Sequence, residues 1–309
     1  MAWTEASIPD QSGKTFVVTG GNSGIGYEAA VALARKKAHV ILACRSPQRA
    51  ADALASLKAA APGASAEVMA LDLASLKSVR AFAESYLAQR KTLDGLVNNA
   101  GLMALPYTKT EDGFEMQLGT NHLGHFALTG LLLPALLAAP AARVVNVASQ
   151  AHRMGRIHFD DLMGERGYEP WAWYGQSKLA NLLFTYELQR RLEAKGARAI
   201  ALACHPGYSA TALQQKGPEM EGSKLKGAIM SLGNALLAQS AAMGALPTLR
   251  AACDPGAKGG DYYGPRGLGE LAGYPTLVRS NARSHDREVQ RRLWEESVKL
   301  TGVTFSELG

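Results

Sequence analysis

The sequence predicts an α/β fold, a single-domain, Rossmann-like, doubly wound parallel sheet of about seven strands with helices on both faces. Three observations predict it. Short apolar runs alternate with longer segments of helical periodicity along the 309 residues. The runs are apolar throughout rather than at every second position, as in strands covered on both faces. A glycine-rich turn also separates the first run from the segment after it.

The predicted strands are short runs of apolar, often β-branched residues bounded by turn residues. They are expected at 15–19, 39–43, 66–73, 93–101, 143–149, 198–207 and near 261–264. Apolar spacing of three and four residues predicts helices between them. These are expected at 27–38, 46–63, 73–90, roughly 112–139, 171–196, in a stretch ending near 252, and at 284–300.

No change in composition divides the chain, so we predict one domain over 1–309, with a C-terminal extension from about residue 265. The extension is expected to pack on the domain, while roles as a pocket cover or a subunit contact stay open. Its segment 285–300 predicts an amphipathic helix. The inward face of this helix is expected to carry Val289, Leu293, Trp294, Val298 and Leu300.

Composition and spacing argue against several kinds of partner. The formal charge is +6, but Lys and Arg are scattered and no nucleic-acid-binding motif is present. Cys44, Cys204 and Cys253 form no CxxC pair, which favours a reducing cytoplasm. The chain lacks an uninterrupted apolar run of about 18 residues, so no transmembrane segment is expected. The histidines show no ligand spacing, and no metal is expected.

A glycine-rich turn, GGNSGIG, follows the first strand and opens the first helix. Glycines allow a tight turn in which a pyrophosphate reaches backbone amides, and a helix N-terminus favours an anion. The residues expected to bind a cofactor here are Gly20, Asn22, Ser23, Gly24, Ile25 and Gly26. Because the spacing is GxxxGxG rather than GxGxxG, a turn without ligand stays open for the glycines alone.

The end of the second strand indicates which dinucleotide is bound. An acid that binds the ribose is expected there in NAD-dependent proteins, but the strand ends Ala43-Cys44-Arg45-Ser46. Arg45 can pair with a 2′-phosphate instead. The missing acid and Arg45 together favour NADP(H) over NAD(H), although an arginine after a strand is common.

Tyr174 and Lys178 are four residues apart in WAWYGQSKLAN, so they share one face of a predicted helix. A nearby ammonium is expected to lower the phenol pKa, which allows Tyr174 to act as a general acid and base. The same spacing arises by chance on many helices, so the pair alone does not decide the chemistry.

At this point the chain resembles the classical short-chain dehydrogenases/reductases, from about residue 13 to 265. The family's motifs occur in its order: TGGNSGIG, LDL, NNAG, NHLGHF, NVAS, YGQSK and HPG. CRSPQRA, NHLGHFALT and YGQSKLANLLFTYEL are most similar to the retinol-dehydrogenase-like branch and its soluble bacterial relatives. Members of this family are oxidoreductases that use nicotinamide cofactors.

The resemblance implies roles that spacing does not. Ser149 would bind the substrate oxygen beside Tyr174, and Asn121 would hold a water that links Lys178 to solvent. Further cofactor contacts would come from Asp72, Leu73, Asn98, Ala100, Gly101, Pro206, Gly207 and Thr211. Lys178 and Tyr174 would also contact the cofactor. A capping role for Asn121 and a strand-end role for Ser149 stay open.

The substrate pocket would be built from 208–252 and 150–173, including Trp171 and Trp173. The apolar residues between 220 and 243 fit a lipophilic ligand, a core helix or a membrane-surface helix. The polar N-terminus departs from the anchored retinol dehydrogenases. We therefore expect a soluble enzyme for a hydrophobic aldehyde, ketone or secondary alcohol, and the identity of the substrate stays open.

Two other functions remain as alternatives. The first is a catalytically idle NADP(H)-binding sensor or scaffold, which the presence of Asn121, Ser149, Tyr174 and Lys178 argues against. The second is a C=C reductase resembling protochlorophyllide reductase.

Family members often pair through helices matching 112–139 and 171–195, so a homo-oligomer is the favoured assembly. The physiological direction stays open.

Overall fold

One sheet of eight strands runs through the computed structural model, which describes residues 2–208 and 239–309. The strand order is β3-β2-β1-β4-β5-β6-β7-β8, and all neighbours are parallel except β7 and β8. The strands are β1 (Thr15–Thr19), β2 (His39–Cys44), β3 (Ala66–Ala70), β4 (Gly95–Asn98), β5 (Arg143–Val147), β6 (Ile200–Cys204), β7 (Tyr262–Pro265) and β8 (Pro275–Leu277). The predicted parallel sheet is confirmed, with β8 as an unforeseen antiparallel edge.

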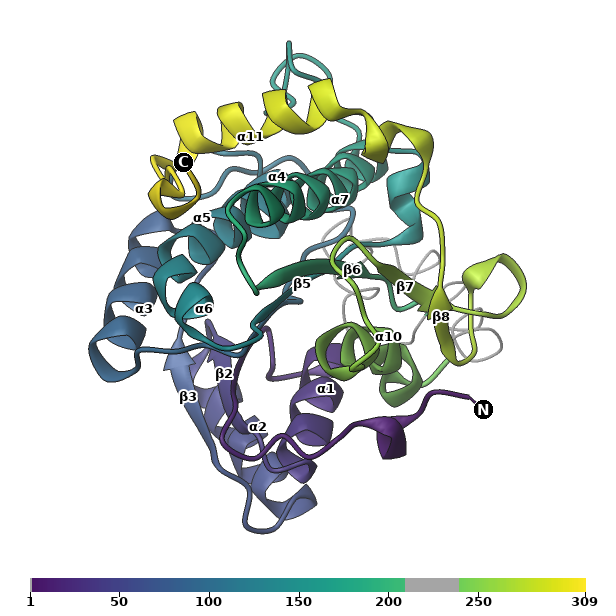
Figure 1. Cartoon of the computed structure of the whole chain (residues 1–309). Helices are drawn as coiled ribbons and strands as arrows, with labels where there is room; N and C mark the ends of the chain where they lie inside the picture. The colour runs from purple at the N-terminus through teal and green to yellow at the C-terminus, as the bar shows by residue number, and fades with distance from the viewer. Residues whose placement is uncertain (1, 209–238) are drawn as a thin grey trace.

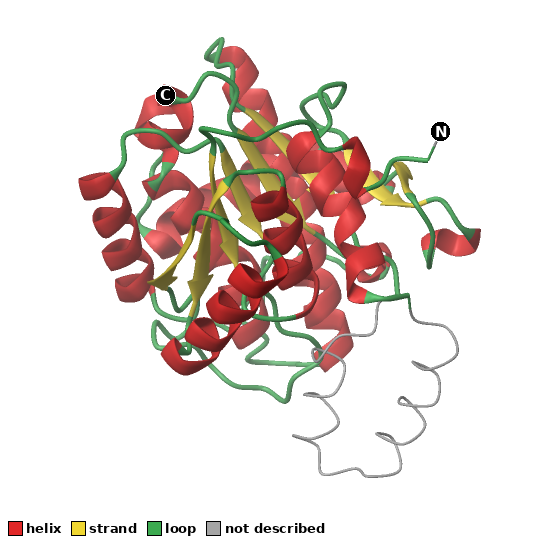
Figure 2. Ribbon diagram, turned by 90° about the horizontal axis from the view of Figure 1, so that it is seen from below, coloured by secondary structure: helices red, strands yellow, loops and turns green. Residues whose placement is uncertain are grey.

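Helices cover both faces of the sheet, as predicted (Figure 1 and Figure 2). On one face lie α1 (Gly24–Arg35), α2 (Pro47–Ala60) and α10 (Ala241–Cys253). On the other lie α3 (Leu76–Gln89), α5 (Gly124–Leu131), α6 (Leu133–Ala138), α7 (Pro170–Ala194) and α11 (Arg287–Thr301). Each face has its own buried cluster, which explains why the central strands are apolar throughout.

The long helix expected over 112–139 is divided into shorter pieces. The chain forms α4 (Met116–Leu118), then a π-helical turn at Gly119–Leu123, then α5 and α6. Pro134 lies in the first turn of α6, where its missing N–H costs no hydrogen bond. The apolar pattern continues across these breaks, so periodicity alone predicted one helix.

The C-terminal helix α11 packs against α7 and α5 (Figure 1). Trp294 is 4% exposed, and its ring centroid lies 5.1 Å from that of Phe126 and 4.5 Å from that of Phe305. Leu293 is also buried, whereas Val289, Val298 and Leu300 are half-buried. The extension therefore covers the helices through which we had expected two copies to pair.

Candidate functional site

The candidate site lies at the carboxyl edge of the sheet, where β1, β4, β5 and β6 end. The strand order reverses at β1, since β2 lies on one side of it and β4 on the other. Ligands of open α/β sheets bind in the crevice at such a switch point. The glycine turn follows β1, Ser149 follows β5, and His205–Gly207 follow β6.

The turn after β1 is closely packed at its glycines, where a side chain would not fit. Gly20 and Gly24 adopt φ angles of +64° and +54°, which favour glycine. A Cβ on Gly20 would lie 3.1 Å from Ala100, and a Cβ on Gly26 would lie 2.7 Å from the Gly20 carbonyl oxygen. The glycines thus bring the start of α1 against the turn after β4, and they form a cradle of bare backbone.

The N-terminus of α1 has no side-chain cap in the described structure, although Ser23 occupies the N-cap position. By contrast, Ser46 and Ser75 cap α2 and α3 through their hydroxyl oxygens. The first N–H groups of α1 are therefore available for an anion, and Asn22 and Ile25 flank them. This cradle fits the pyrophosphate of a dinucleotide.

The ends of β2 and β3 form the other end of this crevice. The Arg45 side chain is 70% exposed, and its Nη1 lies 4.0 Å from Oδ2 of Asp72. The Asp72 carboxylate also accepts the N–H of Ala74, and Leu73 is buried. No carboxylate replaces the missing ribose-binding acid at the end of β2, where Cys44 is buried. The exposed guanidinium is free to turn toward a 2′-phosphate.

Asn98 and Gly101, both predicted to contact the cofactor, lie in different surroundings. Asn98 is buried, and its Nδ2 donates to Oδ1 of Asn146 at 2.8 Å and to Oγ1 of Thr129 at 3.0 Å. Its side chain therefore joins β4, β5 and α5. A Cβ on Gly101 would lie 3.3 Å from both Asn121 Oδ1 and Lys178 Nζ, so this glycine borders two of the predicted catalytic residues.

Tyr174 and Lys178 lie on α7, facing the end of β5. Tyr174 is 5% exposed, and Lys178 Nζ lies 5.8 Å from the centroid of its ring. The ammonium donates to the Val147 carbonyl oxygen at 3.1 Å. Burial lowers the pKa of Lys178 to about 8, an effect opposed by Cys204.

The expected lowering of the Tyr174 pKa by Lys178 is wrong. Burial raises the pKa of Tyr174, and a hydrogen bond with the Ser149 side chain opposes the rise. Lys178 is directed to the Val147 carbonyl instead. The loss of hydration on burial therefore decides the direction of the Tyr174 pKa, rather than the charge of Lys178 one helical turn away.

Asn121 lies within the π-helical turn, and its side chain makes three hydrogen bonds. Its Nδ2 donates to the Leu102 carbonyl and to Ser177 Oγ, each at 2.9 Å, while Oδ1 accepts the Leu102 N–H at 2.8 Å. The side chain thus fastens the loop after β4 to α7. The π turn, a feature frequent at functional sites, widens the helix at this point.

His125, which we did not predict as a site residue, joins Asn121 to the glycine turn. Its Nδ1 donates to the Asn121 carbonyl at 2.9 Å, so Nε2 accepts from the Thr19 hydroxyl at 2.9 Å. Thr19 Oγ1 in turn accepts the N–H groups of Asn99 and Ala100. The spacing of His125 four residues after Asn121 in NHLGHF is the sequence signal from which such a contact could have been predicted.

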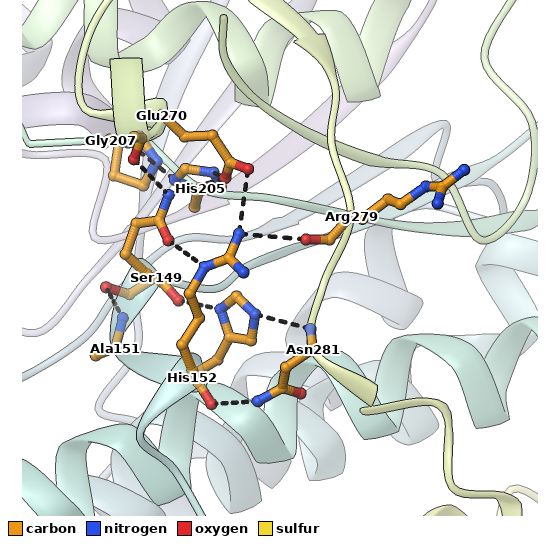
Figure 3. Close-up of polar contacts among 12 residues, drawn as sticks. Ser149, Ala151, His152, His205, Gly207, Glu270, Arg279 and Asn281 are labelled. Carbon is orange, nitrogen blue, oxygen red and sulfur yellow. Dashed lines mark hydrogen bonds and ion pairs between the residues drawn. The ribbon is translucent and has the colours of Figure 1, made fainter. Parts of the chain in front are cut away.

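Ser149 and the turn after β6 complete the site. Ser149 Oγ accepts the Ala151 N–H at 3.2 Å, and its carbonyl accepts His152 Nδ1 at 2.6 Å (Figure 3). Gly207 has a φ of +67°, and its N–H donates to His205 Nδ1 at 3.2 Å. Pro206 lies between them, whereas the predicted contact Thr211 lies outside the described residues.

The two tryptophans before Tyr174 have different environments. Trp171 is 44% exposed, and its ring centroid lies 6.0 Å from that of Tyr174. Trp173 is buried and stacks on His158 at 5.1 Å. Trp171 therefore borders Tyr174, and Trp173 belongs to the core. Most of the apolar residues expected between 220 and 243 lie outside the described residues, but Met243 is half-buried at the start of α10.

Over residues 2–208 and 239–309, no three His, Cys, Asp or Glu side chains gather in a way that could hold a metal ion. Within the same residues, no helix is both long and apolar enough to cross a membrane.

The model of the short chain dehydrogenase family matches residues 14–222. The chain belongs to that family. Human retinol dehydrogenase 13 is 42% identical over 303 residues, which are 97% of this chain and 87% of that protein. Mouse retinol dehydrogenase 12 is 50% identical over 204 residues, 66% of this chain and 63% of that protein. The expected resemblance is confirmed, and this short-chain dehydrogenase is an oxidoreductase by family.

Solved structures support the same assignment. An uncharacterised protein from Mycobacterium paratuberculosis is 42% identical, with a TM-score of 0.82 over 99% of each chain. A Beutenbergia cavernae protein, described as a putative NAD(P)-dependent gluconate 5-dehydrogenase with NADP bound at low occupancy, is 27% identical, with a TM-score of 0.57 over 79% of this chain and 90% of its own.

Proposed function

We propose that this oxidoreductase is an NADP(H)-dependent carbonyl reductase or alcohol dehydrogenase for a hydrophobic small molecule. The observation that carries the proposal is the convergence of Ser149, Tyr174 and Lys178 at the sheet edge that also holds the uncapped start of α1. The retinol dehydrogenases related to this chain support a lipophilic aldehyde or alcohol as the substrate.

The proposed cofactor is NADP(H). Arg45 is exposed and directly follows β2, which ends in Cys44 rather than in an acid. Its guanidinium suits a 2′-phosphate, and the weak contact with Asp72 at 4.0 Å costs little to break. When bound, the reduced nicotinamide supplies the hydride that reaches the carbonyl carbon.

The residues of this chain supply the proton and hold the oxygen. Because burial raises the pKa of Tyr174, the phenol is protonated near neutral pH and suited to donate to a carbonyl oxygen. Ser149 Oγ would donate a second hydrogen bond to that oxygen as it gains negative charge. Lys178 would return a proton to the Tyr174 phenolate, and it would regain that proton from solvent through the water that Asn121 is expected to hold. In alcohol oxidation the same groups would work in reverse, with Tyr174 accepting the proton.

Two rival functions remain testable. An idle NADP(H) sensor would bind the cofactor without turnover, and the assembled Ser149, Tyr174 and Lys178 argue against it. A C=C reductase would leave the carbonyl in its product, which distinguishes it by product analysis.

The state of the three cysteines bears on the compartment in which the protein works. Cys44, Cys204 and Cys253 are buried free thiols, and burial raises the pKa of each. They fit a reducing compartment such as the cytoplasm. The proposed partner is a small molecule.

The test is NADPH consumption, followed at the nicotinamide absorbance band, with all-trans-retinal, linear aldehydes, ketones and quinones as probes and NADH in parallel. Turnover of any carbonyl with NADPH preferred supports the proposal, and the ranking of probes describes the pocket. NADPH binding without turnover across the panel would favour the sensor. A preference for NADH would contradict the reasoning about Arg45.

A further inference from the structure

The loop between β7 and β8 reaches back to the candidate site. It carries Glu270 at the end of a short 3₁₀ helix, Leu268–Glu270. Figure 3 shows the Glu270 carboxylate beside His205. None of the family's sequence motifs named above includes this loop, which lies in the C-terminal extension.

Glu270 accepts hydrogen bonds from three side chains. Its Oε2 accepts His205 Nε2 at 2.9 Å and Gln150 Nε2 at 2.8 Å, and its Oε1 accepts Arg153 Nη2 at 3.1 Å. The hydrogen bond from His205 is the main cause that lowers the pKa of Glu270, so the side chain is a carboxylate near neutral pH. The carboxylate therefore binds two separate segments at once.

The backbone of Glu270 adopts an unfavourable conformation, which indicates that the hydrogen bonds of its side chain offset a conformational free-energy cost. Its φ is +57°, in the left-handed region that a residue with a Cβ adopts at a cost of roughly 1–3 kcal/mol. Such a conformation persists where surrounding contacts determine it. The contacts that hold this side chain are those with His205, Gln150 and Arg153.

Both segments held by Glu270 lead directly into the site. Gln150 follows Ser149, and His205 precedes Pro206 and Gly207. The Gly207 N–H donates to His205 Nδ1, so the proton of the ring lies on Nε2 and is donated to Glu270. One carboxylate thus links the serine segment after β5 with the turn after β6.

The same loop makes further bonds to that turn. The Leu271 carbonyl oxygen accepts the Tyr208 N–H at 2.7 Å. The Gly273 N–H donates to Gln239 Oε1 at 3.1 Å, and Gln239 Nε2 donates to the Pro206 carbonyl at 2.6 Å. A Cβ on Gly207 would also collide with the Leu271 carbonyl oxygen. The loop therefore supports the turn after β6 along its length.

We propose that Glu270 is a positioning residue that holds the His205–Gly207 turn against the Ser149 segment, and so sets how a bound nicotinamide faces the substrate oxygen. This inference rests on the proposed function and on the cofactor contacts expected from Pro206 and Gly207. Glu270 itself does not touch the reacting atoms. It acts by fixing the distance between the two walls of the site.

The test compares Glu270→Ala and Glu270→Gln with a matched control, Glu67→Gln. Glu67 is also a carboxylate bonded to one histidine and one arginine, His39 and Arg90, but it lies near the amino ends of β2 and β3. Two ligands are titrated into each variant: NADPH, by the fluorescence of its nicotinamide, and adenosine 2′,5′-bisphosphate, which lacks the nicotinamide. Turnover of the best carbonyl probe is measured with NADPH and with NADPH deuterated at the transferred position.

Glu270→Ala is expected to lower kcat by about tenfold to a hundredfold, since small misplacements of reacting groups cost that much. Its isotope effect should rise and its bound-NADPH fluorescence should change, whereas adenosine 2′,5′-bisphosphate should bind as in the wild type. Glu270→Gln should lose less, because its one oxygen can still accept from His205 and Gln150. Glu67→Gln should leave all of these readouts unchanged.

Wild-type kcat, isotope effect and nicotinamide fluorescence in Glu270→Ala would overturn the proposal. So would a parallel loss of adenosine 2′,5′-bisphosphate binding, which would indicate a general loss of structure. If the wild type binds NADPH but reduces no probe, the proposed function fails separately. The fluorescence comparison between Glu270→Ala and Glu67→Gln then still decides the role of Glu270.

Discussion

Three buried histidines predict that this protein loses stability steeply in mild acid. His122, His125 and His152 are each at most 1% exposed, and burial is the main cause that lowers their pKa values, to about 3, about 4 and about 4. His125 and His152 also use one ring nitrogen as an acceptor, from the Thr19 hydroxyl and the Asn281 N–H. A second proton on either ring would break that bond.

The sign and size of the effect follow from linkage. Each folded-state pKa lies below the reference value of 6.5, so the unfolded chain binds the extra proton first. Stability from these groups is complete above pH about 6.5 and is lost as the pH falls toward about 4. Lowering the pH from about 7.5 to about 5 costs about 2 kcal/mol for each ring, about 6 kcal/mol in all. That is comparable with a typical total of roughly 5–15 kcal/mol.

The measurement is the free energy of unfolding in urea at several pH values between about 7.5 and about 5. His122→Phe should reduce the pH slope by about a third, because a phenyl ring fits beside Phe126 and Phe184 and does not titrate. A wild-type loss of less than about 2 kcal/mol by pH 5 would refute the assignment of three neutral rings.

Other predictions test the proposed chemistry and the C-terminal extension. Tyr174→Phe should lower turnover by about a hundredfold or more while NADPH binding, measured by fluorescence, is kept; retained activity would remove the phenol from the mechanism. Arg45→Asp should move the ratio of kcat/KM values from NADPH toward NADH, and an unchanged ratio would contradict its role. Trp294→Ala should cost about 3–5 kcal/mol in urea unfolding, and Leu268→Ala, at a position 97% exposed, should cost little. Equal effects of the last two changes would show that α11 is not part of the core.

The sheet and the glycine turn were predictable because their signals are local. Apolar runs such as 15–19 and 39–43 identify strands buried on both faces, and each lies where it was expected. β8 carried no such signal: it has three residues, includes Pro275 and leaves Leu277 exposed. Edge strands of this length depend on the neighbour they pair with, here β7, rather than on their own composition.

The sequence motifs predicted which residues form the candidate site, but they did not predict the contacts and burial that determine how these residues are held. Motifs identified Asn121, Ser149, Tyr174 and Lys178, and the structure brings Tyr174 and Ser149 into hydrogen-bond contact. The direction of the Tyr174 pKa depended on burial, which helical spacing does not report. Glu270 could not be linked to His205 from the sequence, because 65 residues separate them and no periodicity relates them.

The C-terminal extension covers the surface through which two copies of the chain were expected to pair. We had favoured pairing of two copies through α5 and α7, but Trp294 and Phe305 from the extension pack on Phe126 and Phe184 of these helices. Gly130 on α5 allows this close approach, since a Cβ there would lie 2.7 Å from the Phe305 ring. A second copy on this face would first have to displace α11, and exposing Trp294 alone would cost about 3 kcal/mol. Any pairing of two chains should therefore use a different surface from the one that the helices alone suggested.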